Sequence, residues 1–238
     1  MSEGAPLSRS EAAGPHDPKA VVSQDILDMR DARWIGRGGK RNCYVHPRDA
    51  SRCVKIERNR SDRNETLHDL RTYGRLRRWR GTLPRSVAAC HGAVLTSLGP
   101  GAIFDLIRDE ETGRISRTLG DMIDMSLAPE RDTRFDAALT RFREELIASG
   151  VVAADAAAQN ICVQERANGT WRFVLIDGIG RRNLFPYEVF LSLSKRKVRR
   201  LAARQGLFDR AVLLARYERY IRRIGPSGQA LRHRREAE

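Results

Sequence analysis

The chain has 238 residues, 41% of them hydrophobic, and a formal net charge of +14 at pH 7. This length is enough to bury a hydrophobic core, either in one medium domain or in two small lobes around a cleft. The sequence predicts no transmembrane segment, since no apolar run is long enough, and no signal peptide. The positive charge favours anionic partners, although a general preference for arginine over lysine would produce it as well.

The cysteines and histidines exclude a zinc site of the usual spacing. The four cysteines are scattered without a C-x-x-C pair, and the five histidines do not cluster near them. We therefore expect free thiols, which persist in a reducing compartment, and a cytoplasmic protein.

The first half of the chain predicts a small sheet domain over residues 25–107. Residues 1–24 precede it and have the polar, proline- and glycine-containing composition of a disordered tail. The expected order is a strand at 34–35, a glycine-rich turn at 36–42, strands at 43–45 and 52–56, a helix from a capping box at Asp62 and Glu65 to about Trp79, and strands at 87–96 and 102–107 joined by a turn at 99–101.

The second half, residues 108–224, predicts a mainly helical region. A short helix follows Thr118, and residues 131–149 have the apolar spacing of an amphipathic helix that ends before Gly150. Two more helices are expected at 188–204 and 208–224, and residues 225–238 are expected to form a flexible tail.

A predicted hairpin brings two polar side chains together. Its strands are 161–163 and 173–176, and Asn168-Gly169 between them favours a type I′ turn. Antiparallel pairing would bring Asn160, before the first strand, next to Asp177, after the second, where the two could share a hard cation. The alternative is that Asn160 caps a turn and Asp177 merely ends a strand.

The glycine-rich turn and the residues after it suggest a phosphate site. The backbone N–H groups around Gly36 and Gly38 could approach phosphates closely, although most G-x-G pairs are simple turns. Lys55 lies in the centre of an apolar strand and would need an anionic partner in a cleft, unless it is a solvated edge lysine. The next helix offers two such partners, Glu65 and Asp69.

Taken in order, these elements resemble the protein-kinase-like fold, in which a glycine-rich loop, a strand lysine, a helix acid, D-x-x-x-x-N (Asp155 to Asn160) and a final Asp-Gly follow one another. More narrowly, the chain resembles the PhoP regulatory network protein family, the YrbL-like proteins. The resemblance covers roughly residues 30–185. It rests on Ile35-Gly36-Arg37-Gly38, Asn42-Cys43-Tyr44-Val45-His46-Pro47, Arg52-Cys53-Val54-Lys55-Ile56 and Gln159-Asn160-Ile161-Cys162.

The resemblance implies an α+β, bilobal kinase-like fold with a small antiparallel N-lobe, a reduced helical C-lobe, and ATP and Mg²⁺ in the cleft between them. Gly36 and Gly38 would cover the phosphates, with Arg41 at the position of a third glycine. Lys55, paired with Asp69 or Glu65, would contact the α- and β-phosphates. Asp155 would act on the acceptor hydroxyl, and Asn160 and Asp177 would bind the metal.

Several departures from the kinase pattern concern the acceptor side. Ala153-Ala154 replace His-Arg before the catalytic aspartate, and Ala157 replaces a lysine. Asp177-Gly178-Ile179 lacks the phenylalanine of the motif, and no A-P-E segment follows it. We therefore expect a Mg-dependent phosphotransferase whose acceptor is unknown, either a small molecule, a lipid-linked group or a protein. The alternative is a non-catalytic kinase-like regulatory module.

A third interpretation comes from the basic C-terminal helices, which could bind nucleic acid or a membrane surface. The residues are Lys195, Arg196, Lys197, Arg199, Arg200, Arg204, Arg216, Arg219, Arg222 and Arg223. The alternative is an ordinary solvated face, with Val198 and Leu201 packed inward.

Overall fold

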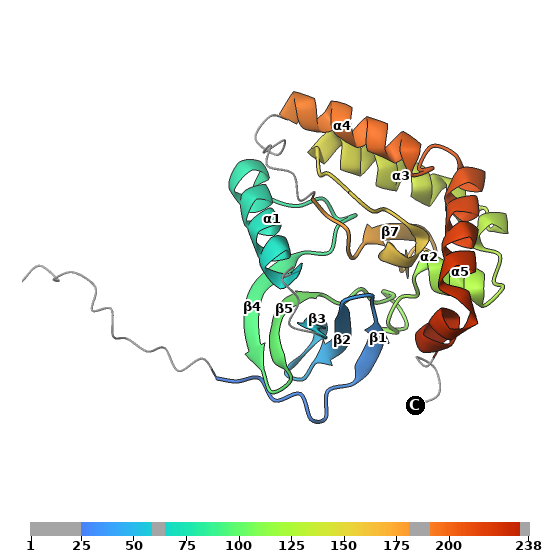
Figure 1. The fold of residues 1–238 in the computed structure, drawn as a ribbon. Helices are drawn as coiled ribbons and strands as arrows, with labels where there is room; N and C mark the ends of the chain where they lie inside the picture. Colours follow the sequence, from blue (N-terminus) through green and yellow to red (C-terminus); the bar gives the residue numbers. More distant parts are fainter. Residues whose placement is uncertain (1–24, 59–64, 181–190, 234–238) are drawn as a thin grey trace, which may run out of the picture.

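The structure of the chain is a computed structural model, and it describes residues 25–58, 65–180 and 191–233 (Figure 1). The predicted tail at 1–24, the capping residue Asp62 and the start of the helix expected at 188 lie outside the described residues. The fold is a mixed α+β arrangement, as the sequence predicted. No helix within the described ranges is both long and apolar enough to cross a membrane.

Five antiparallel strands form a sheet in the order β1-β2-β3-β5-β4. The strands are β1 (Trp34–Arg37), β2 (Arg41–His46), β3 (Asp49–Glu57), β4 (Cys90–Thr96) and β5 (Gly99–Asp105). Alternation along β3 sends Val54 and Ile56 to one face, where they pack on Leu27 and Met29. Lys55 points to the opposite face, as the sequence predicted.

The turn between β4 and β5 differs from the prediction. The structure turns at Ser97 and Leu98, and the Gly99-Pro100-Gly101 segment already belongs to β5. Thr96 stabilises this short turn, because its hydroxyl donates to the Gly99 carbonyl at 2.7 Å and accepts from the Leu98 N–H at 3.2 Å. The strand predicted at 87–96 is also shorter in the structure, where β4 begins at Cys90.

Helices and a two-stranded hairpin form the rest of the fold (Figure 1). The elements are α1 (Glu65–Arg80), α2 (Leu119–Asp124), the 3₁₀ turn η1 (Pro129–Arg131), α3 (Arg134–Ser149), the 3₁₀ turn η2 (Ala158–Asn160), β6 (Ile161–Glu165), β7 (Trp171–Leu175), α4 (Leu191–Arg204) and α5 (Arg210–His233). The predicted stripe of α3 is buried in full, at Phe135, Leu139, Phe142 and Leu146. Gly150 ends the helix with a φ of 68°.

One continuous cluster of buried side chains joins the sheet to the helical part. Tyr73 of α1 and Phe104 of β5 stack edge to face, with ring centroids 5.8 Å apart, and belong to the same cluster as Phe135 and Phe173. The backbone of Val87, just before β4, also pairs with Leu175 of β7. These contacts fix the hairpin against the sheet.

Two details of the second half correct the sequence predictions. The hairpin forms, but Gly169 alone of its Asn168-Gly169 pair has a positive φ, so the turn is not type I′, which needs both. The strands are instead joined by residues 166–170. The expected flexible tail from Gly225 is helical as far as His233, after a break at Gly225, where φ is 65° and ψ is −177°.

Candidate functional site

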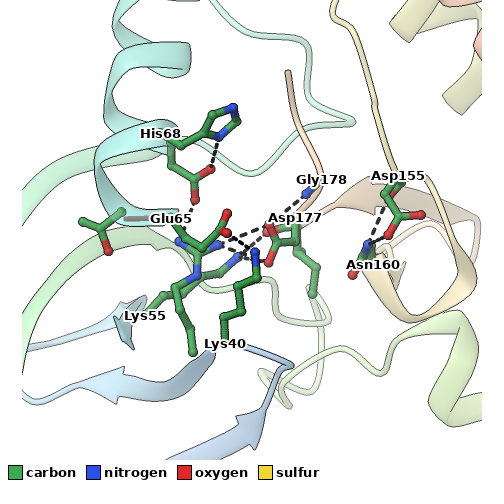
Figure 2. A network of polar contacts seen from close by, with 12 residues as sticks. Lys40, Lys55, Glu65, His68, Asp155, Asn160, Asp177 and Gly178 are labelled. Atoms are coloured by element: carbon green, nitrogen blue, oxygen red, sulfur yellow. Dashed lines mark hydrogen bonds and ion pairs between the residues drawn. The ribbon is translucent and has the colours of Figure 1, made fainter. Parts of the chain in front are cut away.

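A pocket of about 490 Å³ lies between the sheet and the helical part. The glycine-rich turn lines it from the sheet, and Asp155, Asn160 and Asp177 line it from the segments around the β6–β7 hairpin. Lys55 and Phe104 also line it. The structure therefore brings together residues that the sequence separates by more than a hundred positions (Figure 2).

Lys55 is buried on the cleft face of β3, with 8% of its surface exposed. Its ammonium group donates to the Ile176 carbonyl and lies 3.7 Å from Asp177 Oδ2. It also sits 4.5 Å from the centroid of the Phe104 ring. The prediction of a cleft lysine with an anionic partner is thus confirmed, but the partner is Asp177.

Neither helix acid is paired with Lys55 in the described part of the chain, which corrects the expected ion pair. Glu65 is bound by Lys40, from the glycine-rich turn. Asp69 is bound by Arg41, with Nη1 and Oδ2 2.6 Å apart, and His68 Nδ1 lies 3.6 Å from the other Asp69 oxygen.

Arg41 is the central residue that the sequence analysis did not identify as functional. It begins β2 and only 8% of its side chain is exposed, so its charge needs compensation. One side of the guanidinium binds Asp69, and Nη2 donates to both oxygens of Asp177 at 3.2 Å. The two carboxylates raise the pKa of Arg41, although burial opposes them. Arg41 therefore joins α1 to the segment after β7.

The register of the sheet explains this arrangement. Cys43 of β2 faces Lys55 of β3, and Arg41 lies two residues before Cys43 on the same face. The two basic side chains are therefore diagonal neighbours above the cleft. One signal was available in the sequence, since an arginine stood where the kinase-like pattern expects a glycine.

Asp177 receives both cations and is held ionised by them. Burial by itself would raise the pKa of Asp177, but Lys55 and Arg41 outweigh it and lower the pKa to about 2. The Gly178 N–H also donates to its Oδ1 at 2.8 Å. Since 44% of the side chain is exposed, a ligand in the pocket could still reach this carboxylate.

Asp155 and Asn160 form the second polar group of the pocket. The Asn160 amide donates to the Asp155 carboxylate at 3.1 Å and to its backbone carbonyl at 3.0 Å. Partial burial in the pocket raises the pKa of Asp155 and Asp177 adds to the effect, while Arg216 and Asn160 lower it. A raised pKa suits a group that accepts a proton near neutral pH.

Backbone contacts fix Asp155 next to Asp177. The N–H groups of Ala154 and Asp155 both donate to the Gly178 carbonyl, at 2.7 and 3.2 Å. Gly178 has a φ of +78°, and a Cβ there would lie 2.6 Å from the Asp155 carbonyl oxygen. Only glycine therefore lets the two carboxylate-bearing segments approach this closely.

The oxygen atoms of Asp177 and Asn160 are of the type that binds a hard cation, but the described part of the chain places few other ligands near them. Asp177 and Asn160 supply the oxygen atoms that Mg²⁺ prefers, and waters and phosphates usually complete its shell. Among the residues that the structure describes, however, no group of three or more His, Cys, Asp and Glu side chains could hold a metal. A cation at Asp177 would also share that carboxylate with Arg41 and Lys55.

The basic residues of α4 lie as the solvated-face alternative expects. Val198 and Leu201 are buried, while Arg196, Arg199 and Arg200 are exposed.

The fold and the site define a mixed α+β protein with a polar cleft between an antiparallel sheet and a helical part. The family described as PhoP regulatory network protein YrbL matches residues 27–205, and the chain belongs to this family. It is similar to the uncharacterized protein YrbL of Escherichia coli strain K12, with 32% identity over 167 residues, which cover 68% of this chain and 77% of the relative. The YrbL of Shigella flexneri matches with the same identity and coverage.

Proposed function

We propose that the chain is a kinase-like, bilobal protein that binds Mg-ATP in the cleft and transfers its terminal phosphoryl group to an acceptor. The observation that supports this proposal is the meeting of the glycine-rich turn, Lys55 and Asp177 around one pocket. Phosphoryl transfer requires a backbone turn whose N–H groups bind phosphates, a buried cation, and a carboxylate that holds a metal.

Each residue then has a distinct role. The backbone at Gly36 and Gly38 would lie over the phosphates, and Lys55 would move from Asp177 to contact them. Asn160 and Asp177 would hold Mg²⁺, whose chemistry when bound is to neutralise phosphate charge. Asp155, with its raised pKa, would orient the acceptor hydroxyl and accept its proton.

We further propose a cytoplasmic setting, in which the four free cysteines would remain reduced.

The Lys55→Met variant tests nucleotide binding directly. Methionine has a similar length but removes one charge-assisted contact to phosphate, worth about 1.5–3 kcal/mol. We therefore expect Mg-ATP affinity, measured by calorimetry, to fall by at least about tenfold. Lys195→Met on α4 is the matched control and should bind as the parent does. Unchanged affinity in a folded Lys55→Met protein would refute this role.

A non-catalytic regulatory module is the second candidate, and two observations favour it. Arg41 already neutralises the carboxylate that a metal would use, and alanines at 153, 154, 156 and 157 surround Asp155. The family description, a PhoP regulatory network protein, agrees with a regulatory role. Mg-ATP binding without any turnover, after a screen of small, lipid-linked and protein acceptors, would support this candidate over the first.

The basic face of α4 supports a further interaction with anionic polymers or membrane surfaces, and it has its own test. Replacing Lys195, Arg196, Lys197 and Arg199 with glutamine should abolish any salt-sensitive binding to nucleic acid or anionic vesicles, because such binding depends on released counterions. ATP affinity should not change. If the parent binds neither polymer nor vesicle at low salt, α4 presents an ordinary solvated face.

A further inference from the structure

A second polar pocket lies at the turn end of the β6–β7 hairpin. Its volume is about 320 Å³, and we call it the arginine pocket after its lining residues: Arg85, Arg141, Glu145, Arg166, Asn168, Thr170 and Arg172. Asp155, Asn160 and Asp177 are at the other end of the same hairpin, so the two pockets use different residues throughout.

Three separate parts of the chain supply the arginines. Arg85 precedes β4, Arg141 lies on the exposed face of α3, and Arg166 and Arg172 flank the hairpin turn. Glu145, one helical turn after Arg141, accepts a hydrogen bond from the Ser86 N–H at 3.1 Å. This bond ties the loop that carries Arg85 to the helix that carries Arg141.

Contacts within the protein hold the hairpin side of the pocket in place. Arg172 donates to Gln164 at 2.8 Å and to Glu110 at 3.1 Å, and Arg166 lies 3.5 Å from the same Glu110 oxygen. Within the turn, Asn168 Oδ1 accepts from both the N–H and the hydroxyl of Thr170. The guanidinium groups of Arg166 and Arg172 are therefore preorganised.

Positive charge is in excess at this site. Four guanidinium groups face two carboxylates, those of Glu110 and Glu145, which leaves two positive charges uncompensated. Within the described part of the chain, Arg85 and Arg141 make no ion pair, and both are exposed. Burial and the neighbouring Arg166 lower the pKa of Arg172, and Glu110 opposes them. An anion is what this site lacks.

We propose that the arginine pocket binds a phosphate monoester dianion carried by a small organic molecule. Guanidinium groups match the geometry of phosphate oxygens in bidentate pairs, and a monoester at neutral pH carries close to the two negative charges that the site lacks. A single carboxylate would leave one positive charge unpaired. The volume is at the lower end of that for small-molecule sites, and it leaves room beside the phosphate for an organic group.

Calorimetry with two probes, O-phosphoserine and inorganic phosphate, tests the proposal and separates the two sources of phosphate. The parent should bind O-phosphoserine more tightly than inorganic phosphate. The Arg85→Gln/Arg141→Gln double variant should bind it at least about tenfold more weakly, because each lost contact is charge-assisted. Both arginines are exposed and without ion pairs, so this variant should fold. Equal affinity for the two probes would assign the site to free phosphate.

The control variant removes two positive charges outside the arginine pocket. Arg71→Gln/Arg114→Gln also replaces two exposed arginines and should keep the parent's affinity. Protection of Arg85 and Arg141, but not of Arg71 and Arg114, from phenylglyoxal modification would locate the probe. The proposal is overturned if the parent binds neither probe, or if both double variants weaken binding equally. It is also overturned if Lys55→Met abolishes binding while Arg85→Gln/Arg141→Gln does not, since the probe would then occupy the nucleotide cleft.

Discussion

The Asp69→Asn variant should unfold with a free energy about 3 kcal/mol below that of the parent protein. Arg41 is buried, and Asp69 is its shorter ion-pair contact, at 2.6 Å. Removing one partner of a buried ion pair typically costs about 3–5 kcal/mol, because the other charge stays buried and uncompensated. We expect the lower end of this range, since Asp177 still accepts from the other side of the guanidinium.

Urea unfolding followed by tryptophan fluorescence measures this loss, and Glu65→Gln is the matched control on the same helix. Glu65 binds Lys40, whose side chain is 54% exposed, so its loss should cost about 1 kcal/mol or less. The comparison separates a buried pair from an exposed one in the same turn-to-helix contact. Equal losses in the two variants would show that Arg41 does not depend on Asp69.

The second large effect is expected at Asp155. If the chain catalyses transfer, Asp155→Asn should lower basal ATP hydrolysis by roughly 10²-fold or more, as the loss of a positioned acid/base group does. Mg-ATP affinity should remain close to that of the parent, because Asp155 would act on the acceptor or on water rather than on the nucleotide. Hydrolysis is the right assay, since it needs no knowledge of the acceptor.

Asp177→Asn, unlike Asp155→Asn, should weaken nucleotide binding itself. Asp177 would hold the metal, so its variant should lose the part of nucleotide affinity that depends on Mg²⁺, measured by calorimetry with and without the cation. Asp31→Asn, at an exposed site away from the pocket, is the control for both variants. Real hydrolysis in the parent that Asp155→Asn leaves unaffected would remove Asp155 from the catalytic role.

The ion pairs of Asp177 also affect how a metal would bind there. Arg41 and Lys55 both pair with Asp177, so a cation arriving alone would meet a carboxylate that is already paired. Phosphate oxygens that draw Lys55 away would make room for it. We therefore expect nucleotide and metal to bind together more tightly than either does alone, which is the positive coupling of two ligands at one site.

Several features of the protein follow from the sequence alone because they depend on local periodicity. The apolar spacing of α3 determined which of its faces is buried, and alternation along β3 determined that Lys55 lies opposite Val54 and Ile56. Short apolar runs on either side of Asn168-Gly169 predicted the hairpin, with Asn160 and Asp177 at its ends. The family, which the comparison confirms, was suggested by motif resemblance and not by periodicity. Turn details were less well determined, because the 97–98 and 166–170 turns depend on side-chain hydrogen bonds and single φ angles.

Only the tertiary structure decided which charges pair. Residues 40, 41, 55, 65, 69 and 177 carry charges that the sequence allows to combine in many ways, and spacing alone favoured Lys55 with a helix acid. The register of β2 against β3 instead directs Arg41 between α1 and the end of β7, where its longer, forked side chain contacts both Asp69 and Asp177. The strength of an ion pair depends on distance and burial, and these are set by the folded structure and not by the order of residues in the sequence.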